Sequence, residues 1–343
     1  MANLNRGLKE NQDIDIVVLW VDGSDPAWLA QKAQYQPPVS KESNAVNRYR
    51  DWGLMRYWFR AIEKFAPWAR KIHFVTWGHV PEFLDLDAPK LHVVRHDEFI
   101  PAEYLPTFNA NTIEMNIHRI PGLAEHFIYF NDDIFLLQPH EPEDFFRNGL
   151  PCACSSEHPW ITRDLSLGYH IGSNDLYVVN KHFPKPEMMR RHGKKFYSRH
   201  YRWQDNIRTL VFQLFLRHWF VGFAMPHAAA AYLKKTFEEV WAAEPQLLHE
   251  TSLHKFRTAI DVNQWLCLWW QVAGGNFAPY VVDNVQDIPT PSRMEALCRT
   301  IENQEHKMLC MGDPDWDVDF DALSAALQHA FEKILPEKCA YEK

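Results

Sequence analysis

The apolar run from Ile14 to Val21 ends abruptly in an Asp-Gly-Ser-Asp-Pro turn that starts at Asp22. Ile, Val and Trp favour a buried strand, whereas Gly, Asp and Pro end one. Ligands of α/β sheets bind in the loops that follow the carboxyl ends of strands. This loop has neither the glycine pattern of a dinucleotide site nor the Gly-Lys-Ser/Thr of a P-loop. The segment predicts a site in which Asp22 faces a nucleotide or a metal, and any phosphate is bound by other means.

A second apolar run ends in the same way. Residues 126–130 have the composition of a buried strand, and Asn131-Asp132-Asp133 follows them. Two adjacent carboxylates repel each other unless a cation lies between or beside them. Magnesium typically takes one or two carboxylates together with substrate phosphates. Asn and Asp also form ordinary turns, so both interpretations stay open for this segment alone, and the first segment favours a site.

Strands and helices alternate through the first half of the chain. Segments whose apolar residues recur at helical spacing lie between strand-like apolar runs. Strands are expected at 14–21, 71–76, 91–95 and 127–130, and helices at 50–65 and 109–120. This alternation predicts an α/β fold, a Rossmann-like parallel or mixed sheet flanked by helices.

The second half reads differently. We expect irregular structure in residues 150–200, mostly helix in 203–275, an Ala-rich helix directly after His227, and a capped helix at the end. The whole chain, 1–343, is interpreted as one catalytic domain, with an α/β part, 14–150, and a mostly helical part, 151–343, that completes the site. No linker marks the boundary between them.

Composition narrows the class of protein. The chain has 343 residues, of which 46% are hydrophobic, enough for one large domain or two. Its net charge of −8 does not favour a nucleic-acid surface. No window of about 18 apolar residues is free of charge, so we expect no transmembrane helix. The first 13 residues lack the apolar segment of a secretory signal. The six cysteines form no Cys-x-x-Cys pair and are expected as free thiols in a reducing cytoplasm.

Four blocks of the sequence resemble the Stealth family of sugar-1-phosphate transferases. That family includes bacterial capsule and exopolysaccharide phosphotransferases and the catalytic subunit that adds GlcNAc-1-phosphate to lysosomal enzymes. Two long blocks carry most of the likeness, residues 14–26 and the segment from Asn47 to Asp133. Two shorter blocks are Gly172-Ser173-Asn174-Asp175 and Met225-Pro226-His227 with Phe256-Arg257. Together the blocks span most of residues 14–275.

The resemblance implies a GT-A-like sheet whose 14–150 part binds a nucleotide sugar. It also implies transfer of a sugar 1-phosphate to a saccharide or polysaccharide acceptor, which can be lipid-linked. The acceptor hydroxyl attacks the phosphorus that carries the sugar, and nucleoside monophosphate leaves. This step needs charge neutralisation on the diphosphate, a base and in-line alignment. Mg²⁺ or Mn²⁺ held by Asp132 and Asp133 would meet the first need.

The same resemblance assigns roles to individual residues. Arginine suits phosphate because its planar fork binds in bidentate fashion, and histidine suits a base because it titrates near neutrality. His227 could act as the base or as a phosphate contact. The implied catalytic residues are His227, Arg257 and Asp133, and the implied donor-binding residues are Trp20, Asp22, Gly23, Arg50, Asn109 and Asn131.

Several of these residues have a purely structural alternative. Arg50 could form a structural salt bridge, Arg257 could belong to a solvated basic turn, and Asn109 could cap a helix. The 172–175 block could cap a strand or hydrogen-bond sugar hydroxyls. His118 is expected to pack within its helix.

Aromatic and acidic residues elsewhere are expected to be structural. Trp265, Trp269 and Trp270 are predicted core residues. The acidic run 313–319 lacks the Gly and Glu of an EF-hand and is predicted as a turn that caps the last helix.

Two alternative functions remain open from the sequence. A metal-dependent glycosyltransferase would move the sugar alone and release nucleoside diphosphate. A carbohydrate-binding protein without catalysis would leave the paired carboxylates without a role. The expected location is the cytoplasm, where nucleotide sugars are made. Peripheral contact with the inner face of the membrane fits this location, although the sequence shows no strongly basic amphipathic helix.

Overall fold

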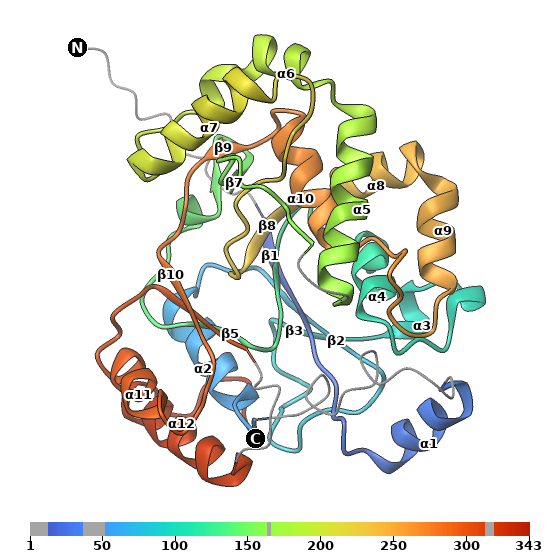
Figure 1. Cartoon of the computed structure of the whole chain (residues 1–343). Helices are drawn as coiled ribbons and strands as arrows, with labels where there is room; N and C mark the ends of the chain where they lie inside the picture. The colour runs from blue at the N-terminus through green and yellow to red at the C-terminus, as the bar shows by residue number, and fades with distance from the viewer. Residues whose placement is uncertain (1–12, 37–51, 163–165, 313–318) are drawn as a thin grey trace.

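A computed structural model describes residues 13–36, 52–162, 166–312 and 319–343 (Figure 1). Its centre is a five-stranded sheet of order β3-β2-β1-β4-β8. The first four of these strands run parallel and the last runs antiparallel to β4. Their bounds are β3 Leu91–Arg95, β2 Ile72–Thr76, β1 Ile14–Leu19, β4 His126–Phe130 and β8 Ala230–Leu233. The α/β prediction is confirmed.

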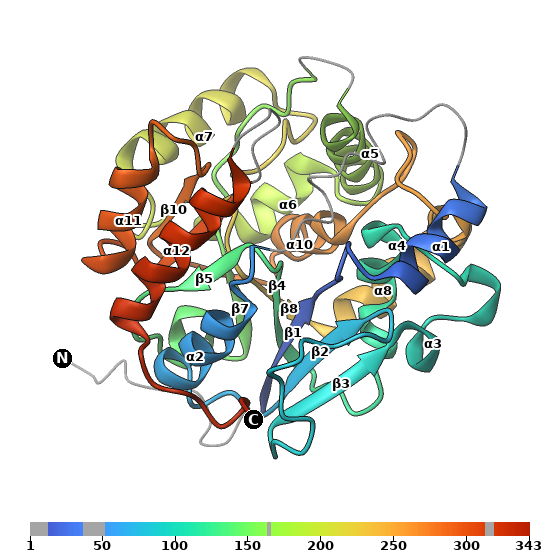
Figure 2. The same cartoon turned by 90° about the horizontal axis from the view of Figure 1, so that it is seen from below.

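The central strands are buried on both faces, as their unbroken apolar runs require. Ile16 and Val18 of β1 belong to one apolar cluster, and Val17 between them belongs to another. Successive side chains of a strand point to opposite faces, so the sheet separates two cores. The molecule therefore has three layers, with helices on each side of the sheet (Figures 1 and 2).

One core lies between the sheet and three helices of distant sequence. Trp58, Phe59 and Phe331 are among its buried aromatic side chains. These helices are α2 Met55–Phe65, α11 Met294–Glu302 and α12 Phe320–Ile334. Asp319 caps α12 by accepting a hydrogen bond from the backbone N–H of Ala322 at 3.1 Å. The rest of the acidic run predicted as a turn, residues 313–318, lies outside the described residues.

The other core lies on the opposite face and contains Phe127, Phe237 and Trp269. Its helices include α4 Ala110–Asn116, α5 Leu167–His182, α8 Lys234–Ala243 and α10 Gln264–Ala273 (Figure 2). The remaining described helices are α1 Pro26–Tyr35, α3 His96–Phe99, α6 Lys185–His192, α7 Trp203–Phe215 and α9 Pro245–Leu253, with short 3-10 helices at Ala102–Tyr104, Ile117–Arg119, Pro142–Asp144 and Gly193–Lys195.

Two small sheets complete the described fold. One pairs β10 Asn284–Asp287, β11 Met308–Met311 and β5 Ile134–Leu136, and the other pairs β6 Phe146–Arg147, β7 Leu150–Ala153 and β9 Ala278–Pro279. All six cysteines are free thiols, as predicted. Across the described ranges, no helix combines the length and the apolar character that crossing a bilayer requires.

Two local predictions about the second half were wrong. Residues 150–200 contain the helices α5 and α6. The alanines after His227 form the strand β8 and not a helix, because their backbone pairs with β4 at the sheet edge. Sheet pairing here overrides the helix propensity of alanine. β8 thereby adds a strand from the second half of the chain to the sheet built by the first half.

Candidate active site

One cavity lies at the carboxyl ends of β1 and β4, where the order in which the chain adds strands to the sheet reverses. β1 and β4 are adjacent and parallel, with Val18 opposite Phe130, so their carboxyl ends meet at one edge. The later strands β2 and β3 lie on the other side of β1. Such a switch point is where open α/β sheets bind ligands. A cavity of about 460 Å³ lies here, and its lining includes Leu19 to Val21 at the carboxyl end of β1 and Asn131 to Asp133 after β4.

Distant segments return to the same cavity. Because β8 is antiparallel to β4, with Ala230 opposite Tyr129, the chain just before β8 lies beside the end of β4. This brings His227 into the lining. The loop between α9 and α10 contributes Arg257, and α4 contributes Asn111 and Glu114.

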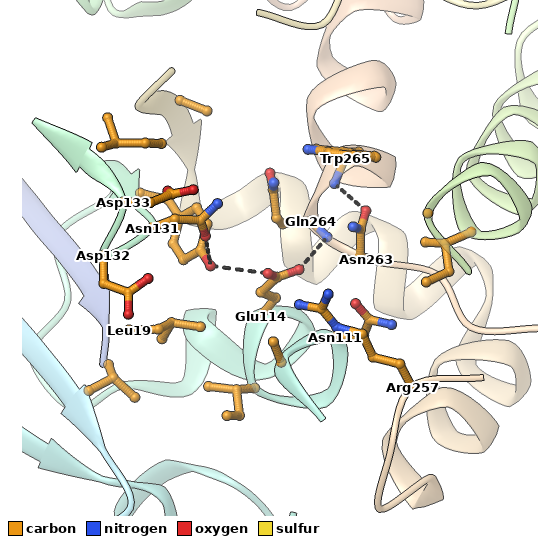
Figure 3. Close-up of a pocket in the computed structure, with 18 of the residues that line it drawn as sticks. Leu19, Asn111, Glu114, Asn131, Asp132, Asp133, Arg257, Asn263, Gln264 and Trp265 are labelled. Carbon is orange, nitrogen blue, oxygen red and sulfur yellow. Dashed lines mark hydrogen bonds between the residues drawn. The ribbon is translucent and has the colours of Figure 1, made fainter. Parts of the chain in front are cut away.

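The paired carboxylates form one wall of the cavity. Figure 3 shows Asp132 and Asp133 on one side, Arg257 on the other and Glu114 between them. Asp132 is exposed and Asp133 is half-buried. The Cys310 thiol lies 3.6 Å from the Asp133 carboxylate and can donate to it. Burial, and then the charge of Asp133, raise the pKa of Cys310 far above its usual range, which keeps the thiol protonated.

The donor set of this wall fits a hard divalent cation. Asp132 and Asp133 offer carboxylate oxygens to the cavity, and Asn131 lines it beside them. Among the residues that the structure describes, no three His, Cys, Asp or Glu side chains are arranged to hold a metal ion by themselves. Two carboxylates are the usual protein share of a magnesium site that substrate phosphates complete.

Arg257 faces a buried acid. Glu114 is only 5% exposed and accepts hydrogen bonds from the Tyr129 hydroxyl at 3.1 Å and the Gln264 backbone N–H at 3.3 Å. Burial raises the pKa of Glu114, and the Arg257 guanidinium opposes that rise. No Asp or Glu oxygen of the described residues lies within 4.0 Å of an Arg257 nitrogen. Its charge therefore remains available to an anionic ligand.

His227 stands at the cavity wall with an aromatic neighbour. Its ring meets Trp265 edge-on, with centroids 6.2 Å apart. The His227 side chain is exposed, and the neighbouring protein lowers the pKa of His227 through partial desolvation. A lowered pKa favours the neutral imidazole, which is the form that can accept a proton.

A buried carboxylate holds the Arg257 loop. Asp261 is fully buried and accepts hydrogen bonds from His254 Nδ1 at 2.6 Å, from the Thr258 hydroxyl at 2.6 Å and from the Thr258 backbone N–H at 3.0 Å. The side-chain amides of Asn109 and Asn111 donate to Oδ2, each at 3.0 Å, which is the oxygen that also accepts the Thr258 backbone N–H, whereas His254 and the Thr258 hydroxyl donate to Oδ1. Asp261 thus ties the loop that carries Arg257 to the start of α4.

Comparison with known proteins identifies the chain. The family model described as Stealth protein CR1, conserved region 1, matches residues 12–37, and Stealth protein CR2, conserved region 2, matches residues 48–152. A capsular polysaccharide phosphotransferase WcwK of Streptococcus pneumoniae is 38% identical over 335 residues, which cover 96% of this chain and 99% of the relative. The chain belongs to the Stealth family.

Other Stealth relatives match over the same length. The receptor polysaccharide phosphotransferase WefC of Streptococcus gordonii is 36% identical over 96% of this chain and 99% of its own. The exopolysaccharide phosphotransferase cps2G of Lactiplantibacillus plantarum is 36% identical over 96% of each chain. The predicted family is confirmed, and its first two blocks, 14–26 and 47–133, overlap with the two matched regions.

Of the remaining residues that the Stealth resemblance assigns to donor binding, the structure places some in the cavity lining and others outside it. Trp20 is 7% exposed and lines the cavity. Asp22 and Gly23 follow the lining residue Val21 but are not part of the lining. Asp22 accepts hydrogen bonds from the backbone N–H and the hydroxyl of Ser24 at 2.8 and 2.6 Å, which closes the turn. Arg50 lies outside the described residues.

Three further predictions concern residues beside the cavity. Asn109 caps α4, its alternative role, by accepting from the backbone N–H of Asn111. Residues 172–175 lie within α5, so the strand-cap interpretation was wrong. His118 packs against Phe237 and Trp241, as expected.

Sequence reasoning missed or misplaced several residues of the lining. Trp269 and Trp270 are core residues as predicted, but Trp265 lines the cavity. His96, which follows β3, also lines it, and burial lowers the pKa of His96 to about 4, so its ring is neutral. The sequence did not single out Glu114, which lines the cavity three residues after Asn111 and on the same helix face.

Proposed function

We propose that this Stealth protein moves a sugar 1-phosphate from a nucleotide sugar to a hydroxyl of a saccharide acceptor in the synthesis of a capsular or other extracellular polysaccharide. The observation that carries the proposal is that Asp132, Asp133, His227 and Arg257 line a single cavity at the sheet's switch point. The relatives' names as capsular and exopolysaccharide phosphotransferases support the same reaction class.

Asp132 and Asp133 would hold Mg²⁺ or Mn²⁺, which fits their oxygen donors. Such an ion, when bound, supplies charge neutralisation to the diphosphate of the donor. The protein's own contribution is to fix two carboxylates at the end of a buried strand, where the sheet holds their backbone in place. The neighbouring Asn131 adds an amide whose oxygen lies 2.8 Å from the Tyr129 hydroxyl and shares the single proton of that hydroxyl with Glu114.

The proposed step joins the acceptor oxygen to the phosphorus that carries the sugar and breaks the bond between that phosphorus and the leaving nucleoside monophosphate. His227 takes the proton of the acceptor hydroxyl as this bond forms. Arg257 donates to the phosphate oxygens, where negative charge is redistributed during transfer. The sugar–oxygen bond stays intact, so the product is a phosphodiester with the anomeric configuration of the donor.

The acceptor is proposed to be a saccharide chain, which can be lipid-linked. The cytoplasm is the proposed location, because nucleotide sugars are made there.

The test is incubation of the protein with a panel of nucleotide sugars and a saccharide acceptor, with products identified by mass. Release of nucleoside monophosphate together with a sugar phosphodiester is expected. Release of nucleoside diphosphate would assign transfer of the sugar alone, and release of no nucleotide from any donor would refute the proposal.

The metal assignment has its own test. Asp133→Asn is expected to lower turnover by about a hundredfold or more without unfolding the protein. The matched control is Asp321→Asn, an exposed acid on α12 outside the cavity lining, which should leave turnover unchanged. Full activity of the native protein in excess chelator would refute the metal role.

A further inference from the structure

Helix α7, Trp203–Phe215, is attached to the protein by its polar face. The Thr209 hydroxyl accepts a hydrogen bond from the backbone N–H of Glu157 at 3.1 Å. Asn206 donates to the Ser198 carbonyl at 2.9 Å. Thr209 is also the buried residue of this helix. Soluble proteins normally bury the apolar stripe of a surface helix and leave its polar face in water, so α7 is turned the opposite way.

The C-terminal end of α7 is anchored by a buried cation. Lys185 is 1% exposed, pairs with Glu157 at 2.8 Å, and donates to the carbonyls of Phe212 at 3.3 Å and Leu216 at 2.9 Å. A cation at the end of a helix satisfies carbonyls that have no partner within the helix. This anchor fixes the outward orientation of the apolar face.

The outward face of α7 is strongly apolar. Phe215 is 78% exposed, Trp203 68% and Trp219 63%. The exposed residues recur at helical spacing and continue into the segment that follows, and we call them the α7 face: Trp203, Ile207, Leu210, Val211, Leu214, Phe215, Leu216 and Trp219. In both views α7 lies at the periphery of the molecule (Figures 1 and 2). Contiguous exposed apolar surface of this kind marks an interaction site.

The segment that carries the α7 face is rich in positive charge. Residues 190–219 contain eight Arg and Lys against a single acidic residue, Asp205, in a chain whose net charge is −8. Six of these cations are exposed: Arg190, Arg191, Lys194, Arg199, Arg202 and Arg217. The segment that carries the α7 face is therefore basic within an otherwise acidic protein, and Arg191 and Arg208 in it pair with Glu187 and Asp205.

We propose that the α7 face docks on an anionic lipid bilayer. Interfacial helices insert Trp, Phe and Leu into the boundary between headgroups and acyl chains, while flanking Lys and Arg contact anionic headgroups. The α7 face has this combination, with Trp203 and Trp219 at its two ends. The long arginine side chains beside it can reach headgroups while their stems cover apolar surface.

Charge also disfavours a second copy of this chain as the partner of the α7 face. A twofold contact through the α7 face would bring two basic rims together, and like charges that approach in this way repel. A bilayer with anionic headgroups instead complements both the apolar centre and the basic rim. This inference is independent of the proposed reaction, because it rests on a surface outside the cavity lining.

The test is sedimentation of the full chain with vesicles in the absence of any substrate. One set contains phosphatidylcholine alone, and the other contains equimolar phosphatidylcholine and phosphatidylglycerol. We expect the wild-type chain to sediment with the anionic set. Replacing both Trp203→Ser and Phe215→Ser should weaken that binding about tenfold or more, because two exposed aromatic side chains no longer enter the bilayer.

Matched variants separate the apolar and electrostatic contributions. Leu86→Ser alters an exposed leucine, 54% exposed and outside the α7 face, and should bind as the wild type does. Arg199→Glu with Arg202→Glu should remove the preference for anionic vesicles. These residues are exposed, so the variants are expected to fold, which circular dichroism checks.

Three results would overturn the proposal. The first is a wild-type chain that binds neither vesicle set. The second is undiminished binding by the Trp203→Ser, Phe215→Ser variant. The third is a dimer, detected by light scattering, that this variant abolishes while vesicle binding is absent, which would assign the α7 face to a second copy.

Discussion

Replacement of Asp261 by alanine should destabilise the protein far more than an ordinary loop substitution. The carboxylate accepts five hydrogen bonds, from His254, twice from Thr258, and from the amides of Asn109 and Asn111. Asn109 and Asn111 are 0% and 1% exposed. Water therefore cannot replace the lost acceptor without a rearrangement.

The magnitude follows from these buried donors. A buried donor left without a partner costs about 1–3 kcal/mol, so the two amides alone give about 2–6 kcal/mol. Loss of a buried ionic partner acts in the same direction. We therefore expect Asp261→Ala to lower the free energy of unfolding by about 4 kcal/mol, a large share of the roughly 5–15 kcal/mol typical of a domain.

A similar pair on the surface supplies the control. Asp283, 58% exposed, lies 3.1 Å from the ring of His306. Exposed pairs contribute about 0–1 kcal/mol, so Asp283→Ala should change stability little. Equilibrium denaturation of both variants measures the difference. Equal losses would refute the reasoning that burial makes Asp261 important.

Asp261→Ala should also lower the turnover of the enzyme. Arg257 lies four residues before Asp261 in the anchored loop. We expect turnover to fall at least about tenfold, because catalytic groups must be held close to their productive geometry. If Asp261→Ala does not fold, Asp261→Asn keeps most of the side-chain volume, and its turnover at a temperature where it is folded provides the same comparison.

Three further predictions concern the cavity and the same loop. His227→Ala and Arg257→Ala should each lower turnover by about a hundredfold with little change in melting temperature; steady-state kinetics and thermal denaturation check this, and unchanged turnover would remove the residue from the mechanism. Burial raises the pKa of Glu114, so the pH–rate profile should contain an ionisation above 4.5 that Glu114→Gln lacks; superimposable profiles would contradict this. The hydrogen bond to Asp261 raises the pKa of His254 above 6.5. The stability that this pair adds should therefore be present below pH 6.5 and be lost as pH rises through the raised pKa. Denaturation of the wild type and of Asp261→Asn across this pH range tests the prediction, and a difference in stability that does not change with pH would refute it.

The Asp261 carboxyl of the same pair gives the opposite dependence of stability on pH. Burial raises the pKa of Asp261, but hydrogen bonds from His254 and Thr258 outweigh it, and the net pKa lies below the usual 3.8. Its stabilising contribution is therefore present above pH 3.8 and is lost as pH falls through the lowered value. The His254–Asp261 pair therefore stabilises the protein most between the lowered pKa of Asp261 and the raised pKa of His254.

Local sequence patterns predict the strands and turns that frame the cavity. Apolar runs at 14–19 and 126–130 are buried because both faces of a central parallel strand are covered. The residues that end them, Asp22 and Asn131 to Asp133, are of types that favour turns, and the turn at Asp22 is closed by hydrogen bonds from Ser24, two residues on. Local signals of this kind also located the Arg257 loop and the cap of the last helix.

Contacts between distant segments establish which elements these strands and turns pack against. The alanines after His227 become a strand because β4 offers them an unpaired edge. Asp261 acquires its importance from two asparagines about 150 residues earlier in the chain. The apolar spacing of α7 is the same whether that stripe faces a core or water. Its polar contact to the distant Glu157, together with the nearer contact to Ser198, turns the stripe outward. Periodicity fixes which side chains share a helix face, whereas long-range contacts fix where that face points.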